Sequence, residues 1–249
     1  MTTFYIKNNQ KVEDKIYIFG EDVNHIKNVL RYKINDELYV CDEDETRFFC
    51  QIIEFEKDKI VLQIQNVMEE TTEPKIEVDL YQGLPKSDKL EWIIQKGTEI
   101  GVKKFIPVIT DRVIVKLDEK NELKKLERWQ KIAKEAATQS GRQMIPIIEN
   151  TINLQNSIEK LSKYDIVIVP YECEFENSLW HTLKSLDADV RQIAVVIGPE
   201  GGFSEHDIEV LKTLKRVQMV SLGKRILRTE TAGIVTVSNI LYELEGLDL

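Results

Sequence analysis

The chain has 249 residues, of which 42% are hydrophobic and 31% charged, proportions that are ordinary for a soluble globular protein. Its longest apolar runs, such as 166–169 and 193–197, are far too short to span a membrane. A net charge of -9 argues against a simple nucleic-acid-binding protein, but residues 1–72 carry 9 basic and 15 acidic side chains whereas residues 86–142 carry 14 and 9.

The cysteines and histidines indicate neither a disulfide framework nor a metal site. The three cysteines show no C-x-x-C spacing, and their odd number argues against a set of disulfides. This usage favours a reducing cytoplasm. The three histidines are scattered, so we expect no metal, and the first residues lack the apolar stretch of a signal peptide.

The first 70 residues have the pattern of a small β-barrel. Three segments rich in Val, Ile, Phe and Tyr predict strands at 37–41, 47–55 and 59–67. A short helix interrupts them from Asp22, where apolar residues fall three or four positions apart. The polar stretch 69–74 ends in proline and predicts a linker. We therefore expect a barrel domain at 1–72 and a second domain at 73–249.

Beyond the linker, predicted strands alternate with predicted helices. The strands lie at 76–82, 105–110, 166–169, 193–197 and 217–222. The helices lie at 87–101, with Ser87 as the expected cap, and at 119–139, 177–186, 205–214 and 230–244. This alternation predicts an α/β domain with a mostly parallel sheet covered on both faces. Ligands of such sheets bind outside the carboxyl ends of the strands, so we expect the site there.

A glycine-rich loop follows the predicted strand 193–197. It reads Gly198-Pro199-Glu200-Gly201-Gly202-Phe203, and Ser204 then opens a helix in a capping box with Asp207. Its three glycines let the backbone approach a ligand closely. The loop has neither the GxGxxG nor the GxxxxGKS spacing, so the usual dinucleotide and P-loop sites are not indicated.

Two further loops follow strand ends. The strand 217–222 leads into a cationic loop that contains the apolar pair Ile226 and Leu227, which could hold a flat heterocycle while the charges meet phosphates. The loop after 166–169 contains Pro170-Tyr171-Glu172.

The two C-terminal motifs together resemble those of one family. IGPEGG at 197–202 and LGKRILRTETA at 222–232 are similar to motifs of the knotted, SPOUT-type RNA methyltransferases, specifically the ribosomal RNA small subunit methyltransferase E family. Similar segments cover nearly the whole chain: 86–89, 96–102, Arg112, 139–142, Pro146, His25, 29–31 and 35–36. The chain departs from the family at Thr138, where relatives often carry an acidic residue, and in its acidic barrel.

The resemblance implies a fold, partners and a reaction. The fold is a SPOUT methyltransferase domain with a C-terminal trefoil knot, preceded by a PUA-like β-barrel that helps to bind RNA. The cofactor is S-adenosyl-L-methionine, and the partners are 16S ribosomal RNA in the small subunit and a second copy of the chain, with no membrane and no metal. The reaction is methylation of N3 of a uridine, uridine 1498 in the family, in the cytoplasm.

The resemblance and the strand-end loops together nominate site residues. The cofactor-binding candidates are Pro170, Glu172, Ile197, Gly198, Glu200, Gly201, Leu222, Gly223, Ile226, Leu227 and Ala232. The RNA-binding candidates are Arg31, Lys86, Lys89, Arg112, Lys224 and Arg225.

The reaction itself suggests three catalytic candidates. As N3 loses its proton, negative charge spreads over O2 and O4 of the uracil, and a planar guanidinium would stabilise it. Arg228 is the first candidate for this role and Arg142 the second. Glu230 is the nearest motif carboxylate that could orient an arginine or accept the proton. It could equally be a residue favoured at a helix start by the helix dipole.

Three other functions stay open. The glycine-rich loop could serve a nucleotide-dependent oxidoreductase, although the spacing argues against it. The chain could instead be a non-catalytic RNA-binding or ribosome-assembly protein, because a cofactor loop does not prove turnover. A SPOUT methyltransferase that acts on transfer RNA is the nearest alternative in chemistry.

Overall fold

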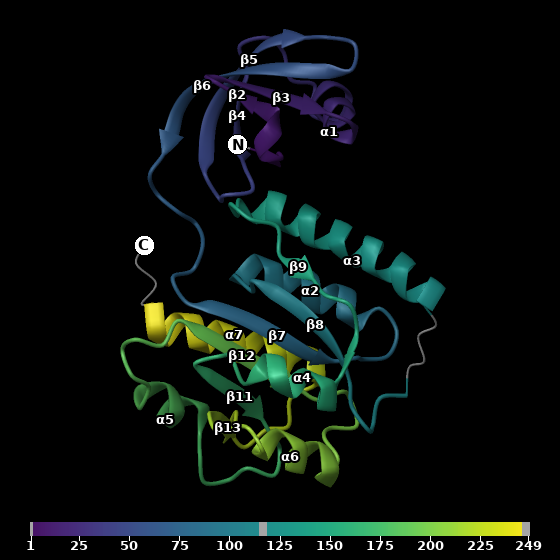
Figure 1. Ribbon diagram of the computed structural model, residues 1–249, viewed down its shortest axis with the longest axis vertical. Coiled ribbons are helices and arrows are strands. Elements are labelled where there is room, and N and C mark those ends of the chain that lie inside the picture. The colour runs from purple at the N-terminus through teal and green to yellow at the C-terminus, as the bar shows by residue number, and fades with distance from the viewer. Residues whose placement is uncertain (1, 115–118, 246–249) are drawn as a thin grey trace. The chain divides into compact units, whose positions relative to one another are not determined.

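The structure is a computed structural model that describes residues 2–114 and 119–245, with only the backbone described at 119–121 (Figure 1). The chain forms two compact units. The first contains residues 1–73 and 137–145, and the second contains residues 74–136 and 146–249. The segment 137–145 therefore belongs to the first unit although residues 74–136 of the second unit precede it in sequence.

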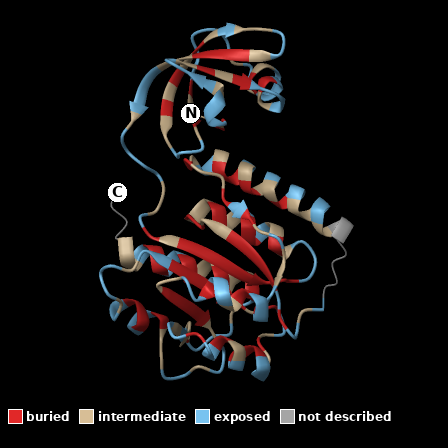
Figure 2. Ribbon diagram, in the orientation of Figure 1, coloured by how far each residue is buried: buried red, intermediate tan, exposed pale blue. Residues whose placement is uncertain are grey.

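The first unit is built on a six-stranded sheet. Its strands are β1 (Thr3–Tyr5), β2 (Lys11–Val12), β3 (Lys15–Phe19), β4 (Glu37–Cys41), β5 (Arg47–Phe55) and β6 (Lys59–Met68). Their order is β1-β4-β5-β6-β3-β2, and every pairing is antiparallel except that of β1 with β4. Every second residue of β5 is buried from Phe48 to Ile52, as expected for a strand with one face on a core (Figure 2). The three strands predicted in this region are confirmed.

Helical turns cover part of this sheet. A short helix, α1 (Glu21–Asn24), continues directly into a π-helical turn, η2 (His25–Val29), and a 3₁₀ turn, η1 (Asn8–Gln10), lies between β1 and β2. The helix expected from Asp22 is thus present as two short pieces. Val23 and Ile26 from these pieces are buried in the core of the sheet, which explains the apolar spacing in the sequence.

The second unit is built on a parallel sheet. Its strands are β7 (Glu77–Gly83), β8 (Lys104–Ile109), β9 (Ile147–Ile148), β10 (Ile152–Asn153), β11 (Ile166–Pro170), β12 (Gln192–Ile197) and β13 (Val217–Val220). Their order is β10-β8-β7-β12-β11-β13, β9 pairs with β8, and all of these pairings are parallel. Ile193 to Ile197 are all buried, because a central parallel strand is covered on both faces. The predicted mostly parallel sheet is confirmed.

Helices cover both faces of this sheet. They are α2 (Lys89–Ile100), α4 (Leu154–Leu161), α5 (Leu179–Lys184), α6 (Glu205–Lys212) and α7 (Thr229–Glu245). A further helix, α3 (Glu119–Ser140), begins in the second unit, and its residues from 137 onward belong to the first. Tyr81 and Val196 point to the face where α4 and α6 pack. Leu80 and Ile197 point to the opposite face, where they lie next to Gly233 of α7. No helix in the described part of the chain is long and apolar enough to cross a membrane.

Helix starts show what local sequence can and cannot predict. The capping box of Ser204 and Asp207 is confirmed, because Ser204 Oγ accepts from the Asp207 N–H and Asp207 Oδ2 accepts from the Ser204 N–H. The expected cap at Ser87 is wrong. Asp88 occupies the N-cap position of α2, and Ser87 adopts a left-handed φ of 57° in the preceding turn.

Candidate functional site

A cavity of about 430 Å³ lies in the second unit, where the loops after β11 and β12 meet the start of α7. Its volume is within the range of about 300–1,000 Å³ that is usual for small-molecule sites. It lies at the carboxyl ends of two neighbouring parallel strands, as the sequence predicted. The lining residues are Lys89, Pro170, Glu172, Ile197, Gly198, Pro199, Glu200, Gly202, Phe203, Ile226, Leu227, Arg228, Thr229 and Ala232.

Most of the cofactor-binding candidates line this cavity. Those that do are Pro170, Glu172, Ile197, Gly198, Glu200, Ile226, Leu227 and Ala232, whereas Gly201, Leu222 and Gly223 do not. Sequence reasoning missed Pro199, Gly202, Phe203, Thr229 and Lys89 as lining residues. All but Lys89 lie inside or directly beside the quoted motifs, so the motifs could have led to them. Lys89 was predicted to bind RNA, and the sequence did not place it at the cavity.

The glycines allow two loops to pack closely at the cavity. A Cβ on Gly198 would lie 3.2 Å from the carbonyl carbon of Gly202. Gly202 has a φ of +67°, and a Cβ there would lie 2.5 Å from Oε1 of Glu172. A side chain at Gly198 would crowd the turn of its own loop, and a side chain at Gly202 would displace the carboxylate of Glu172 from the loop after β11. The cavity wall therefore depends on both glycines.

A buried hydrogen-bond chain supports the glycine-rich loop. Gln82, at the end of β7, is fully buried and donates from Nε2 to Oγ1 of Thr229, at 2.8 Å. Thr229 in turn donates from Oγ1 to the carbonyl oxygen of Gly198, at 2.6 Å. The chain joins β7, the first residue of α7 and the cavity wall.

The segment after β8 braces the same loop. Arg112 donates from Nη1 to the carbonyl oxygen of Gly201, at 2.8 Å. The neighbouring Asp111 accepts from Ser204 Oγ at 2.7 Å, and its N–H donates to Oδ1 of the buried Asp207 at 3.2 Å. Arg112, predicted to bind RNA, therefore makes a contact that shapes the glycine-rich loop.

Lys89 lies between two carboxylates. Its Nζ is 3.0 Å from Oε1 of Glu200 and 3.4 Å from Oε2 of Glu230. Burial would raise the pKa of Glu200, but the hydrogen bond from Lys89 and the N–H of Lys86 bring that pKa below its ordinary value. The hydrogen bond to Glu200 likewise raises the pKa of Lys89. Lys89 is therefore engaged with the cavity wall, and within the described residues no arginine forms an ion pair with Glu230.

Arg228 lies at the rim of the cavity and is exposed. Among the described residues its guanidinium forms no ion pair and no hydrogen bond, so it is available to a bound molecule. Lys224 and Arg225, just before it, are also exposed. This distribution leaves one arginine at the cavity and two cations beside it.

Arg142 occupies a different setting in the first unit. It is only 4% exposed, and its Nε lies 3.1 Å from Oε2 of Glu73. Glu73 also accepts from the N–H of Gln143, at 2.7 Å. These contacts give Arg142 a place in the packing of the first unit, whereas every residue that lines the cavity belongs to the second. Its catalytic role stays a prediction.

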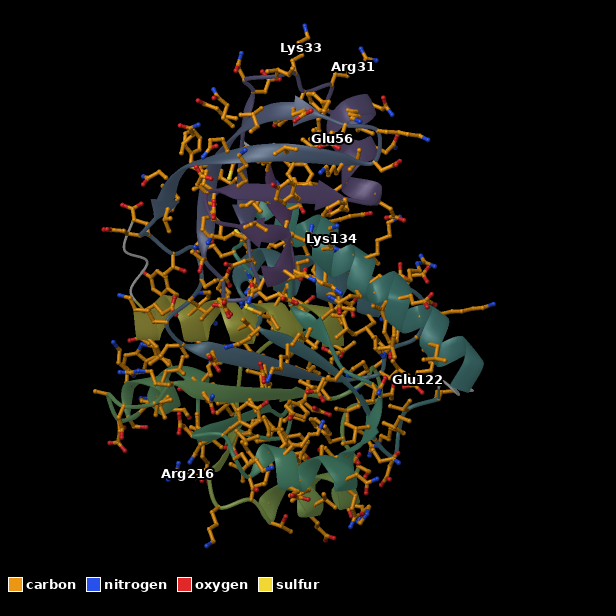
Figure 3. All side chains as sticks on the ribbon, turned by 45° about the horizontal axis from the view of Figure 1, so that its top comes forward. Arg31, Lys33, Glu56, Glu122, Lys134 and Arg216 are labelled. Atoms are coloured by element: carbon orange, nitrogen blue, oxygen red, sulfur yellow. The ribbon has the colours of Figure 1, made fainter. Side chains whose placement is uncertain are left out.

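The remaining candidates are surface residues. Arg31 follows η2 with a φ of 55°, and its side chain is exposed and projects away from the ribbon of the first unit (Figure 3). Lys86 is exposed, and its backbone N–H binds Glu200. In residues 2–114 and 119–245, no group of three or more His, Cys, Asp or Glu side chains is placed to hold a metal ion.

Comparisons with known proteins agree with this architecture. The sequence profile of RNA methyltransferase domains matches residues 72–241, and the profile of RNA methyltransferase PUA domains matches residues 20–65. The chain is 39% identical to the ribosomal RNA small subunit methyltransferase E of Bacillus subtilis, over 99% of this chain and 98% of that protein.

Two solved structures are similar over almost their entire length. One is the ribosomal RNA small subunit methyltransferase E of Neisseria gonorrhoeae bound to S-adenosyl methionine, with a TM-score of 0.83, 28% identity and 97% coverage of both chains. The other is a putative methyltransferase of Legionella pneumophila in complex with the same cofactor, with a TM-score of 0.83, 28% identity and 96% coverage of both chains.

Proposed function

We propose that this chain, which belongs to the ribosomal RNA small subunit methyltransferase E family, methylates RNA of the small ribosomal subunit. S-adenosyl-L-methionine is the methyl donor, and the target is N3 of a uridine, uridine 1498 of 16S ribosomal RNA. The observation that carries the proposal is the cavity at the ends of β11 and β12, lined by the two motifs that the family resemblance rests on. Small ribosomal subunits as substrate imply a cytoplasmic enzyme.

The cavity residues fit this cofactor. Ile197, Ile226 and Leu227 provide apolar walls for a flat heterocycle, and Glu172 and Glu200 provide acceptors for hydroxyl or ammonium groups. Neither Gly198 nor Gly202 has room for a Cβ, so both glycines are needed for the tight turn that brings the loop backbone to the cavity. When bound, S-adenosyl-L-methionine supplies an activated methyl group.

The protein must then favour loss of the N3 proton. Arg228 is exposed at the cavity rim and unpaired among the described residues, which supports a role in stabilising negative charge on O2 and O4 of the uracil. Glu230 lies two residues away, and its Oε2 is 3.4 Å from Nζ of Lys89. A carboxylate held beside the cavity in this way supports Glu230 as the group that accepts the proton or orients the base.

Methyl transfer tests the proposal directly. The protein is incubated with labelled S-adenosylmethionine and small subunits from cells that lack this activity, and the modified nucleoside is identified by mass spectrometry. We expect N3-methyluridine. Label in transfer RNA would indicate the related methyltransferase, and RNA binding without label in any RNA would indicate a non-catalytic protein.

A paired substitution tests the role of Arg228. We expect Arg228→Ala to lower the transfer rate about 100-fold or more while cofactor affinity changes little, because it removes a group that meets developing charge. Arg216→Ala is the matched control, since Arg216 is an exposed arginine of the same unit outside the cavity (Figure 3). Equal losses of rate and cofactor affinity in Arg228→Ala would place the arginine in the cofactor site instead.

We also propose a homodimer and a C-terminal knot. Trp92, Trp180 and Tyr242 are exposed on α2, α5 and α7, and α7 packs against the other two helices, which supports a protein interface there. The chain after β13 pairs with the loop after β11, since the Ser221 N–H donates to the Asn177 carbonyl at 2.8 Å. This contact supports a C-terminal segment passing beside that loop before α7. Sedimentation analysis of the protein tests the dimer.

A further inference from the structure

Five charged side chains gather at the cavity. Lys89, Arg228, Glu172 and Glu200 line it, and Glu230 adjoins it through its ion pair with Lys89. Two cations therefore face three carboxylates. Within the described structure Lys89 is ion-paired, whereas Arg228 is not.

Lys89 forms ion pairs with two of these carboxylates, those of Glu200 and Glu230. Lys89 is the first residue of α2, Glu200 lies in the glycine-rich loop, and Glu230 lies in the first turn of α7. The Nζ distances of 3.0 and 3.4 Å place one ammonium between both. The side chains are one-third exposed or less, so water screens these charges only in part.

We propose that Lys89 sets the charge of the cofactor cavity and thereby the relative affinity for the cationic cofactor and its neutral product. This inference rests on the proposed function. S-adenosylmethionine carries one more positive charge than S-adenosylhomocysteine, because methyl transfer converts a sulfonium into a thioether. A cavity without Lys89 has two uncompensated carboxylates and attracts the sulfonium form more strongly.

The advantage of the lysine follows from the direction of the charge change. The positive charge on sulfur disappears as the methyl group leaves. Attraction that stabilises this charge before transfer must be lost in the transition state, so it slows the reaction. Lys89 holds Glu200 of the cavity wall and Glu230 beside it while cancelling part of this attraction. We infer this role in place of the phosphate contact expected from the sequence.

Binding of both ligands tests the inference without any need for turnover. Dissociation constants for S-adenosylmethionine and S-adenosylhomocysteine are measured by titration calorimetry on wild type, Lys89→Met and Lys89→Arg. We expect Lys89→Met to shift the ratio of the two constants in favour of S-adenosylmethionine by about threefold or more, since a unit charge acts across a partly screened cavity. Lys89→Arg keeps the charge and should keep the wild-type ratio.

Two further variants separate charge from packing. Lys96→Met removes an equal charge from the same helix, at a lysine paired with Glu99 outside the cavity, and should leave the ratio unchanged. Lys89→Met combined with Glu200→Gln restores the net charge and should restore the ratio even if both affinities stay low. An unchanged ratio in Lys89→Met, with both affinities reduced equally, overturns the inference. If wild type binds neither ligand, the proposed function fails and the inference fails with it.

Discussion

The buried hydrogen-bond chain under the glycine-rich loop predicts the effect of Thr229→Val. Valine has nearly the shape of threonine, so the change removes the hydroxyl without opening a cavity. The Gly198 carbonyl then loses its 2.6 Å donor, and Gln82 loses an acceptor but keeps the Gly83 carbonyl at 3.0 Å. The substitution therefore affects the carbonyl group of Gly198, which lines the cavity, and the side chain of Gln82, which is fully buried.

The size of the effect follows from these two groups. A buried polar group left without a partner costs about 1–3 kcal/mol. Here the Gly198 carbonyl loses the Thr229 hydroxyl, whereas the Gln82 amide keeps its hydrogen bond to the Gly83 carbonyl. We expect a loss of about 2 kcal/mol in the free energy of unfolding. With a urea dependence of about 2 kcal/mol per molar, the midpoint should fall by about 1 M. Cofactor affinity should fall as well, because Gly198 is held less firmly.

Tryptophan fluorescence is a suitable assay, because all three tryptophans belong to the second unit and only Trp129 is buried. Its emission therefore reports unfolding of the second unit, which contains the hydrogen bonds from Gln82 to Thr229 and from Thr229 to Gly198. Thr213→Val is the control, since Thr213 makes a similar bond to the Val210 carbonyl on the exposed end of α6 and should change stability by about 0.5 kcal/mol or less. If both variants unfold at the same urea concentration, the buried hydroxyl does not support the loop.

Three further predictions follow from single side chains. Gly202→Ala should lower cofactor affinity, because its Cβ displaces the Glu172 carboxylate. Gly20→Ala, at a similar φ in open space, should cost only backbone strain of about 1–3 kcal/mol, and calorimetry together with urea unfolding would separate the two effects. Burial raises the pKa of Asp79, so folding disfavours its charged form, and the wild-type protein loses stability as pH rises above 3.8. Asp79→Asn has no such charge, so its stability relative to wild type should increase with pH, and a constant difference from pH 3.5 to 8 would contradict this. A thiol reagent should label Cys173 alone in the folded protein, because burial raises the pKa of both other cysteines to about 12; mass spectrometry after digestion would detect any second label.

The strands that end at the site could be predicted because the composition that identifies each strand lies within the strand itself. β11 and β12 are short apolar runs between polar turns, and burial on both faces requires that composition. α4 was missed because one of its buried positions is Ser157, whose hydroxyl donates to the Leu154 carbonyl. A polar residue in the buried face interrupts the apolar spacing on which helix prediction depends.

The candidate site could be predicted only as far as the motifs extend. The glycine-rich loop and the cationic loop carry their own signals, and the rule for strand ends placed both at one edge of the sheet. Lys89 follows β7 in sequence and Arg112 follows β8. Both lie near the glycine-rich loop after β12 because β7 pairs with both β12 and β8 in the folded sheet. That strand order is a property of long-range pairing, and a lysine or arginine in a sequence does not reveal which carboxylate or carbonyl it will meet.

The discontinuous first unit has a consequence for biosynthesis. Residues 1–73 leave the ribosome first, but Glu73 has no Arg142 to pair with until the chain is almost twice as long. Until 137–145 has been made, Glu73 lacks both the Arg142 guanidinium and the Gln143 N–H that it binds in the folded unit, so the first unit should acquire its full protection only afterwards. A truncated fragment that ends at the linker should accordingly fold less stably than the same sheet in the intact chain, and adding the 137–145 peptide covalently should restore it.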